Sequence, residues 1–168
     1  MKKRLMIISV LLIAVMVMLG VSTSVFAKGI SKKNALKKAL KNAKLSKSKV
    51  RAIDVELEHG KYEIEFVRKS NKAEYDYKIS KKNGKILEKS VDYNLKYKKS
   101  GKKISKAAAR KKAAKASGVK LSIVKKGTCK YEKGKYEVKF KTKKRRYEYE
   151  INARNKKVLE YEWKLICR

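Results

Sequence analysis

The chain of 168 residues carries the same series of short motifs twice, and this repeat constrains the fold more than any other feature. Each copy starts with Ile-Ser-Lys and a stretch rich in alanine and lysine, and continues through Gly-Lys-Tyr-Glu, Tyr-acidic-Tyr and Leu-Glu motifs. Equivalent residues lie 74 positions apart up to Phe66 and Phe140, and 72 positions apart from Tyr75 and Tyr147 onward. The repeat predicts two small units with one fold, which differ by one short deletion.

The first 27 residues have the three parts of a secretory signal. They begin with bases at residues 2–4, continue with an apolar stretch at residues 5–19 and end with small residues at Ala27. We therefore expect cleavage after Ala27 and a mature protein that is secreted or associated with the cell wall. An uncleaved membrane anchor is the alternative, because the apolar run extends to Val21.

The hydrophobic pattern changes from a helical to a strand period within each copy. Ser31 and Ser105 precede stretches with apolar residues at helical spacing, so each is a predicted helix N-cap. Alternating apolar and charged residues follow, and Asn83-Gly84 predicts a two-residue hairpin between antiparallel strands. The expected fold class is α+β, with two tandem units of one N-terminal helix packed on a four-stranded antiparallel sheet. The expected divisions are a signal peptide at residues 1–27, a first unit at 28–93, a basic linker at 94–103 and a second unit at 104–168.

These motifs resemble the PepSY domain family, in two copies at residues 30–93 and 104–165. The resemblance rests on the Ile-Ser start of an alanine-rich helix, the Gly-Lys-Tyr-Glu strand, the Tyr-acidic-Tyr strand and the turn into Lys-Ile-Leu-Glu or Lys-Val-Leu-Glu. The second copy departs from the pattern at Gly127, where the first has Ile53, and at Asn155-Lys156-Lys157, where the family turns through glycine. PepSY domains occur in propeptides of thermolysin-like metalloproteases and in secreted or membrane-attached bacterial proteins. The resemblance therefore implies an inhibitory or peptidase-regulating role, and it supplies no catalytic residue.

The residue pattern argues against an enzyme. His59 is the only histidine and adjoins Gly60 at an expected hairpin, which favours an exposed turn residue over a base or a metal ligand. No spacing of His, Cys and acidic residues indicates a metal site, and the acidic residues alternate with bases in a way that cross-strand ion pairing explains. We expect a non-enzymatic protein without a metal or another cofactor.

The net charge of +34 is concentrated in two stretches. Residues 28–53 hold ten bases, residues 93–131 hold fourteen, and neither stretch contains an acid. They predict attraction to anionic cell-wall polymers such as teichoic acid, to an anionic membrane surface or to nucleic acid; a merely solvated lysine surface is the alternative. Lysine far outnumbers arginine, which favours diffuse attraction, so nucleic acid is not expected as a specific partner. The predicted polyanion-binding residues are Lys32, Lys33, Lys37, Lys38, Lys41, Lys102, Lys103, Arg110, Lys111 and Lys112.

Two cysteines in a secreted chain raise the question of a disulfide. Cys129 and Cys167 fall at inward positions of the first and the last strand of the second unit, so both also fit the role of small core residues. At roughly 4.8 Å per strand these two strands lie about 14 Å apart, which exceeds the span of a disulfide. Curling of the sheet or a tail that crosses it would still allow the bond, and intermolecular pairing is a further alternative.

Two functional hypotheses follow. The first is a secreted, non-enzymatic binding module that regulates an extracellular peptidase by binding an extended peptide at a sheet edge or on the sheet face. The second is a cationic cell-surface protein that binds anionic polymers. The two are compatible, because the helices can hold the protein at the wall while the sheets bind a peptide. The identity of the ligand and the oligomeric state are left open.

Overall fold

The computed structural model describes residues 29–96 and 100–166. The predicted signal peptide at residues 1–27 lies outside this part of the chain, as does Cys167. The elements are α2 (Lys32–Ala43), the 3-10 helix η1 (Lys47–Lys49), β1 (Val50–Glu58), β2 (Lys61–Arg68), β3 (Glu74–Ser80), β4 (Ile86–Asp92), α3 (Lys106–Ser117), α4 (Leu121–Lys125), β5 (Thr128–Glu132), β6 (Lys135–Lys141), β7 (Arg145–Asn152) and β8 (Val158–Leu165).

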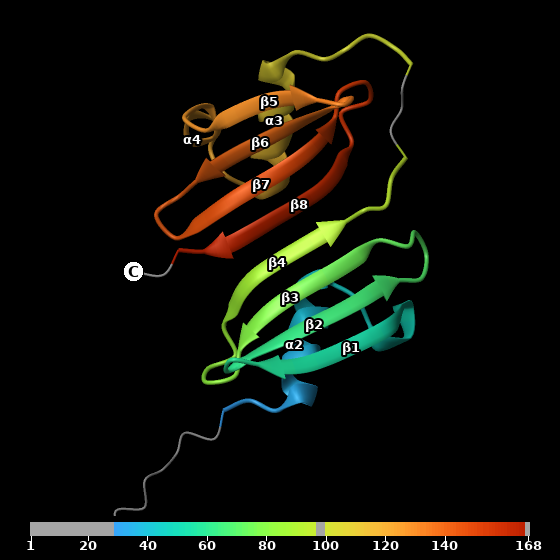
Figure 1. Cartoon of the computed structure of the whole chain (residues 1–168), viewed down its shortest axis with the longest axis vertical. Coiled ribbons are helices and arrows are strands. Elements are labelled where there is room, and N and C mark those ends of the chain that lie inside the picture. Colours follow the sequence, from blue (N-terminus) through green and yellow to red (C-terminus); the bar gives the residue numbers. More distant parts are fainter. Residues whose placement is uncertain (1–28, 97–99, 167–168) are drawn as a thin grey trace, which may run out of the picture.

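All eight strands form one antiparallel sheet in the order β1-β2-β3-β4-β8-β7-β6-β5 (Figure 1). The α+β class and the sequence of a helix followed by strands are as predicted. The prediction of two separate four-stranded sheets was wrong, because β4 pairs with β8 and joins the units. This pairing removes two of the four edges that separate sheets would expose, and exposed edges invite unwanted association.

The seam between β4 and β8 has a local pseudo-twofold axis. Ser90 lies opposite Glu162, and these two residues are themselves equivalent in the repeat. The flanking pairs, Glu88 with Lys164 and Asp92 with Glu160, exchange places under the same symmetry. The units therefore meet as the two halves of a symmetric dimer would.

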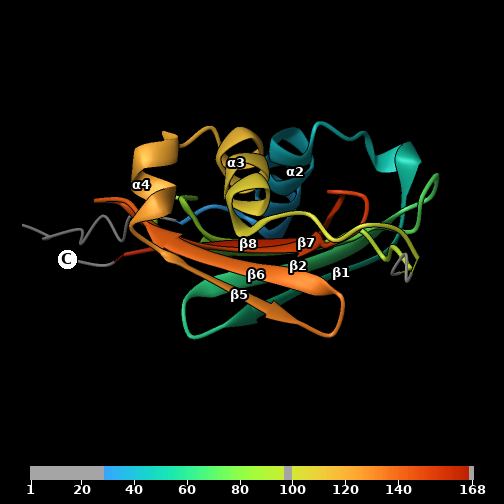
Figure 2. The same ribbon diagram turned by 90° about the horizontal axis from the view of Figure 1, so that it is seen from above.

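Both long helices cover the same face of the sheet and leave the other face open (Figure 2). Ser31 caps α2, because its Oγ accepts a hydrogen bond from the Asn34 amide at 3.3 Å. Ser105 caps α3 by accepting from the Ala108 amide at 3.2 Å. The predicted N-caps are thus confirmed in both copies. The short helix α4 was not predicted, and its Val124 is fully buried at the position that Val50 occupies in the first unit.

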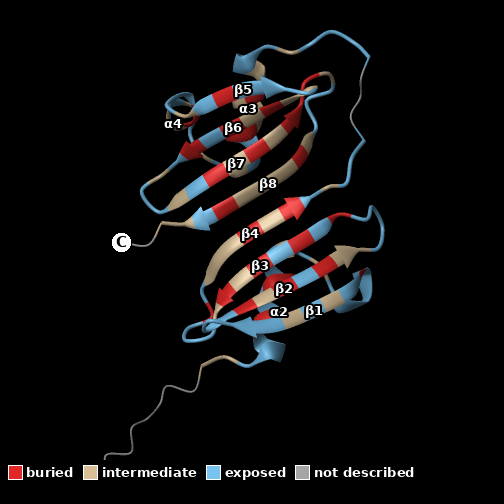
Figure 3. Ribbon diagram, in the orientation of Figure 1, coloured by how far each residue is buried: buried red, intermediate tan, exposed pale blue. Residues whose placement is uncertain are grey.

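Side chains that alternate along the strands build the core against the helices (Figure 3). The first unit buries Tyr62, Ile64 and Phe66 of β2, and the second buries Tyr136, Val138 and Phe140 of β6. Each unit has its own cluster of buried residues, and Ile86 and Tyr161 pack against both clusters. The apolar interior therefore continues across the seam.

One of the turns differs from the expectation. Asn83-Gly84 does not form a two-residue hairpin, because β3 ends at Ser80 and β4 begins at Ile86. Gly84 lies within this longer connection with a φ of 68°. A Cβ there would lie 2.6 Å from Nζ of Lys38, which reaches the turn from α2.

Gly127 explains why the second copy departs from the repeat pattern at this position. A Cβ on Gly127 would lie only 1.9 Å from the carbonyl oxygen of Lys139, so only glycine allows the chain to pass this close to β6. The first strand of the second unit, β5, begins directly after Gly127, at Thr128. It has five residues, whereas β1 has nine.

Candidate binding surfaces

Charge is divided between the two faces of the sheet. All fifteen acidic residues of the chain lie on strands, and helices α2 and α3 contain none. On β2, Glu63 and Glu65 alternate with side chains that are buried beneath α2, and they therefore point to the open face. The same alternation and the strand register place the other acidic residues on that face. The molecule thus has a lysine-covered helix side and an open sheet side that carries the carboxylates.

The carboxylates of the first unit crowd around Asp76. Burial, together with the neighbouring charges of Glu65, Glu74, Asp92 and Glu88, raises the pKa of Asp76 from 3.8 to about 6. Bases interleave with the acids more closely in the second unit, where Lys139 lies 2.9 Å from Glu137 and 3.1 Å from Glu148. Negative charge is therefore densest over β2, β3 and β4.

The predicted polyanion-binding residues divide between the helices and the segment before α3. Lys32, Lys33, Lys37, Lys38 and Lys41 lie on α2, and Arg110, Lys111 and Lys112 lie on α3, so the sheet brings two distant stretches to one side. Three members of the predicted set also have intramolecular contacts.

Lys38 donates to the carbonyl of Gly84 at 3.2 Å, and Arg110 donates to that of Gly127 at 3.1 Å. Nζ of Lys103 lies 4.4 Å from the centre of the Tyr131 ring. These three cations therefore already contribute to the fold, and polyanion binding by the whole set remains a prediction.

The sheet has two outer strands, β1 and β5, and equivalent apolar side chains are exposed on them. Leu57 of β1 is 42% exposed and Tyr131 of β5 is 41% exposed, and these residues are 74 positions apart in the repeat. Tyr131 contacts the ring of Tyr136 at a centroid distance of 5.3 Å in addition to Lys103. The edge at β1 is the longer of the two, because β1 has nine residues and β5 has five.

A buried lysine lies at the seam on the helix side. Lys89 is 8% exposed, and its Nζ donates to Oδ1 of Asn42 at 3.1 Å. The ammonium lies 5.3 Å from the ring of Tyr77 and 5.6 Å from the ring of Tyr161. Burial lowers the pKa of Lys89 to about 8. The sequence analysis missed this residue, although its inward position two residues before the buried Val91 was a usable signal.

Cys129 is buried on β5, and its Sγ lies 3.9 Å from the carbonyl oxygen of Lys106. Burial raises the pKa of this thiol. Two strands, β6 and β7, separate β5 from β8, as the sequence suggested for the second unit. Because Cys167 lies outside the described residues, its pairing with Cys129 stays a prediction.

The part of the chain that the structure describes contains no group of three or more His, Cys, Asp or Glu side chains arranged to hold a metal. His59 is exposed in the turn between β1 and β2, with a φ of 44°, as predicted. Among residues 29–96 and 100–166, no helix is long and apolar enough to cross a membrane.

Comparison with known families identifies the repeated unit. The sequence model described as "Peptidase propeptide and YPEB domain" matches residues 29–89 and 103–162. The chain belongs to the PepSY family. Two PepSY domains thus account for most of the described chain. No curated protein sequence matches it.

One solved structure agrees with this assignment at the level of the fold. The C-terminal domain of Bacillus megaterium YpeB is 16% identical, with a TM-score of 0.51, and the match covers 80% of this chain and 63% of that one. This PepSY chain therefore spans less than two thirds of that structure. A putative lipoprotein from Clostridium difficile, 15% identical with a TM-score of 0.30, is matched over 81% of this chain and 94% of its own.

Proposed function

We propose that this PepSY protein is a secreted, non-catalytic binding module that regulates an extracellular peptidase by binding an extended peptide segment at the edge of β1. The family description, which includes peptidase propeptides, supports the class of partner. The observation that carries the proposed mode of binding is the open edge of β1. This nine-residue strand is an outer strand of the sheet, and its Leu57 is exposed. An added strand gains main-chain hydrogen bonds there.

The hydrogen-bonding pattern of β1 defines which amides are available. His59 and Gly60 form a two-residue turn, so the closing pair of Glu58 and Lys61 is hydrogen bonded and the pattern alternates from there. The amides of Leu57 and Val55 therefore point to the free side. The Val55 amide already donates to Oδ1 of Asp54 at 2.7 Å, so a strand that pairs with this residue must displace the carboxylate.

The side chains of β1 indicate the sequence of the bound peptide. Asp54, Glu56 and Glu58 lie on the open face, whereas Val55 and Leu57 lie on the helix side. A strand paired with β1 places its own side chains next to these in alternation. The favoured peptide therefore alternates basic and apolar residues over about five positions.

The test compares the mature chain with Leu57→Pro, which removes an outward amide and leaves the bonds to β2 intact. Titration with the peptide acetyl-Lys-Val-Lys-Val-Lys-amide and inhibition assays on secreted thermolysin-like metallopeptidases are the two measurements. We expect Leu57→Pro to weaken peptide binding at least tenfold, and the equivalent Tyr131→Pro on β5 to have little effect. Equal binding by both variants would exclude the β1 edge, and unchanged activity across the peptidases would exclude regulation.

Attraction to anionic cell-wall polymers is the second candidate function. It is favoured by the position of α2 and α3 on one side of the sheet, because this places two acid-free stretches next to each other. Binding to purified teichoic acid should fall steeply between low salt and roughly 0.5 M salt, at which exposed charges are strongly screened. Binding that persists at high salt would contradict diffuse attraction.

A further inference from the structure

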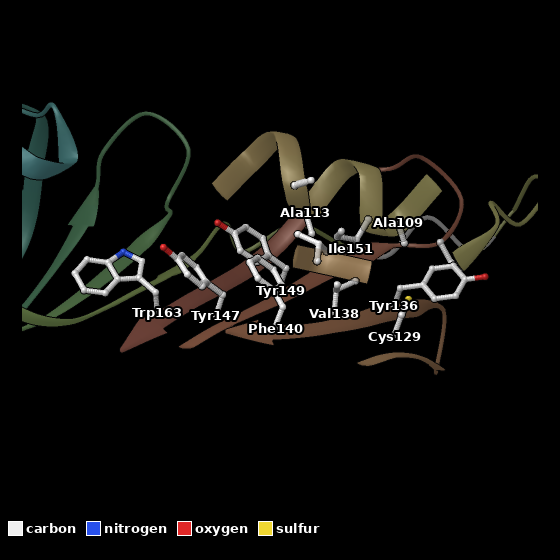
Figure 4. Close-up of a cluster of buried hydrophobic side chains, with 13 residues drawn as sticks. Ala109, Ala113, Cys129, Tyr136, Val138, Phe140, Tyr147, Tyr149, Ile151 and Trp163 are labelled. Carbon is white, nitrogen blue, oxygen red and sulfur yellow. The ribbon is translucent and has the colours of Figure 1, made fainter. Parts of the chain in front are cut away.

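A small pocket opens on the helix side of the second unit, over β7 and β8. Its volume is about 240 Å³. Ala116, Ser117, Arg145 and Val158 form part of its lining. The rest of the lining is aromatic and consists of Tyr93, Tyr147, Tyr149, Tyr161 and Trp163. Figure 4 shows Trp163, Tyr147 and Tyr149 side by side, with both tyrosine hydroxyls directed toward the helix side of the sheet.

The repeat provides an internal comparison, because the first unit fills the equivalent space with its own side chains. Asn42 and Lys89 occupy the positions that Ala116 and Tyr161 hold in the second unit. In the first unit, Oδ1 of Asn42 accepts from both Tyr77 and Lys89, each at 3.1 Å. Ala116 has no polar atom in its side chain and is too short to close the pocket. The second unit is therefore open where the first is filled.

This difference changes the surroundings of one tyrosine hydroxyl. Tyr149 is the equivalent of Tyr77 and is only 3% exposed. Tyr77 donates to Oδ1 of Asn42, whereas Ala116 offers no side-chain acceptor to Tyr149, which lines the pocket. The hydroxyl of Tyr149 can therefore donate a hydrogen bond to a ligand oxygen in the pocket.

The size and charge of the pocket restrict its occupant. A cavity of about 150 Å³ can hold benzene, whereas drug-sized ligands need roughly 300 Å³ or more, so this pocket suits a single aromatic ring. The guanidinium of Arg145 lies 4.0 Å from the centre of the Trp163 ring. No acidic residue lines the pocket, and α3 beside it has none. The electrostatics therefore favour a ligand with a carboxylate.

We propose that this pocket binds an aromatic side chain from an acidic peptide segment. The ring packs among the tyrosines and Trp163, a neighbouring carboxylate pairs with Arg145, and a peptide oxygen accepts the hydrogen bond from Tyr149. The site is independent of the β1 edge, which faces a different kind of peptide.

The pocket contains the only tryptophan of the chain, so the fluorescence of Trp163 reports directly on its occupation. The probe is acetyl-Glu-Phe-Glu-Glu-amide, titrated into a chain that begins at Lys28 and retains every described residue. The comparison peptides replace Phe by Ala or all Glu by Lys. We expect saturable binding of the first peptide that is at least tenfold tighter than binding of either comparison peptide.

Three variants locate the binding. Ala116→Asn copies the first unit, supplies an acceptor to Tyr149 and narrows the pocket, and Arg145→Gln removes the cation. Each should weaken binding at least tenfold, whereas Lys115→Gln, a loss of one exposed charge on α3, should change it less than twofold. Equal affinity for the Phe and Ala peptides would overturn the proposal, as would full binding by both Ala116→Asn and Arg145→Gln.

Discussion

At the scale of single residues, Asp76 shows the cost of gathering the acidic residues on one face. Its folded pKa of about 6 lies above the ordinary value of 3.8, so the folded state disfavours its ionised form. The contribution of this group to stability therefore grows as the pH falls through 6 and levels off below about 4. At neutral pH the burial of the charged Asp76 carboxylate, together with its crowding with Glu65 and Glu74, destabilises the fold.

We predict that Asp76→Asn raises the free energy of unfolding at pH 7 by up to about 1 kcal/mol, since it removes a half-buried charge and its repulsion from the neighbouring carboxylates. The gain should disappear near pH 4, where Asp76 is already protonated. Urea unfolding at both pH values measures the effect. Glu58→Gln, which removes an exposed charge at the end of β1, is the control. A gain of equal size at both pH values would show that repulsion is not the cause.

At the scale of elements, the sequence was a reliable guide wherever a local pattern determines the structure. Ser31 and Ser105 cap their helices because the cap bonds only to residues of the same turn, and the period-2 stretches became strands for a similarly local reason. The hairpin at Asn83-Gly84 was predicted too short, and the equivalent connection of the second unit, between Asn152 and Val158, is of the same length. The length of this turn therefore does not follow from the Asn-Gly pair alone.

At two equivalent positions with a left-handed backbone, one copy has a glycine and the other has a lysine. Lys44 follows α2 with a φ of 58°, where the second copy has Gly118, and Lys156 has a φ of 61°, where the first has Gly84. A left-handed backbone costs a lysine more than a glycine. Lys44→Gly and Lys156→Gly should each raise the free energy of unfolding by about 0.5–1 kcal/mol, and the two gains should add. Thermal unfolding measures these gains. The control is Lys157→Gly, because Lys157 lies outside the left-handed region, and it should not raise the free energy of unfolding.

At the scale of the whole molecule, the joining of both units in one sheet could not be predicted from the sequence. The pattern defined four strands in each copy, but the pairing of β4 with β8 depends on two edges that meet only after each unit has formed. For the same reason the pocket beside α3 was not predicted, since Ala116 and Tyr161 are distant in sequence. The repeat shows that Ala116 stands where the first unit has Asn42, but only the folded structure shows that this difference opens a pocket.

The pseudo-twofold seam predicts different behaviour for the two units when they are separated. If each unit pairs with a second copy of itself in the seam register, the first unit places Glu88 opposite Asp92 twice, and Ser90 lies opposite its own copy. The second unit places Glu160 opposite Lys164 twice and Glu162 opposite its own copy once, so attractive pairs still outnumber the repulsive one. Opposite charges across strands stabilise a pair by roughly 0.2–1 kcal/mol, and like charges destabilise it. We therefore expect residues 103–168 to dimerise at least tenfold more tightly than residues 28–96.

Sedimentation velocity over a range of concentrations measures both dimers. Glu88→Lys in the isolated first unit places a cation opposite Asp92 and should bring its dimerisation close to that of the second unit, while Glu58→Lys, far from the seam, should not. Equal dimerisation of both wild-type units would show that the charges do not select the partner at the seam. The observed joining of β4 to β8 would then follow from the linkage of the units in one chain, which makes their association intramolecular.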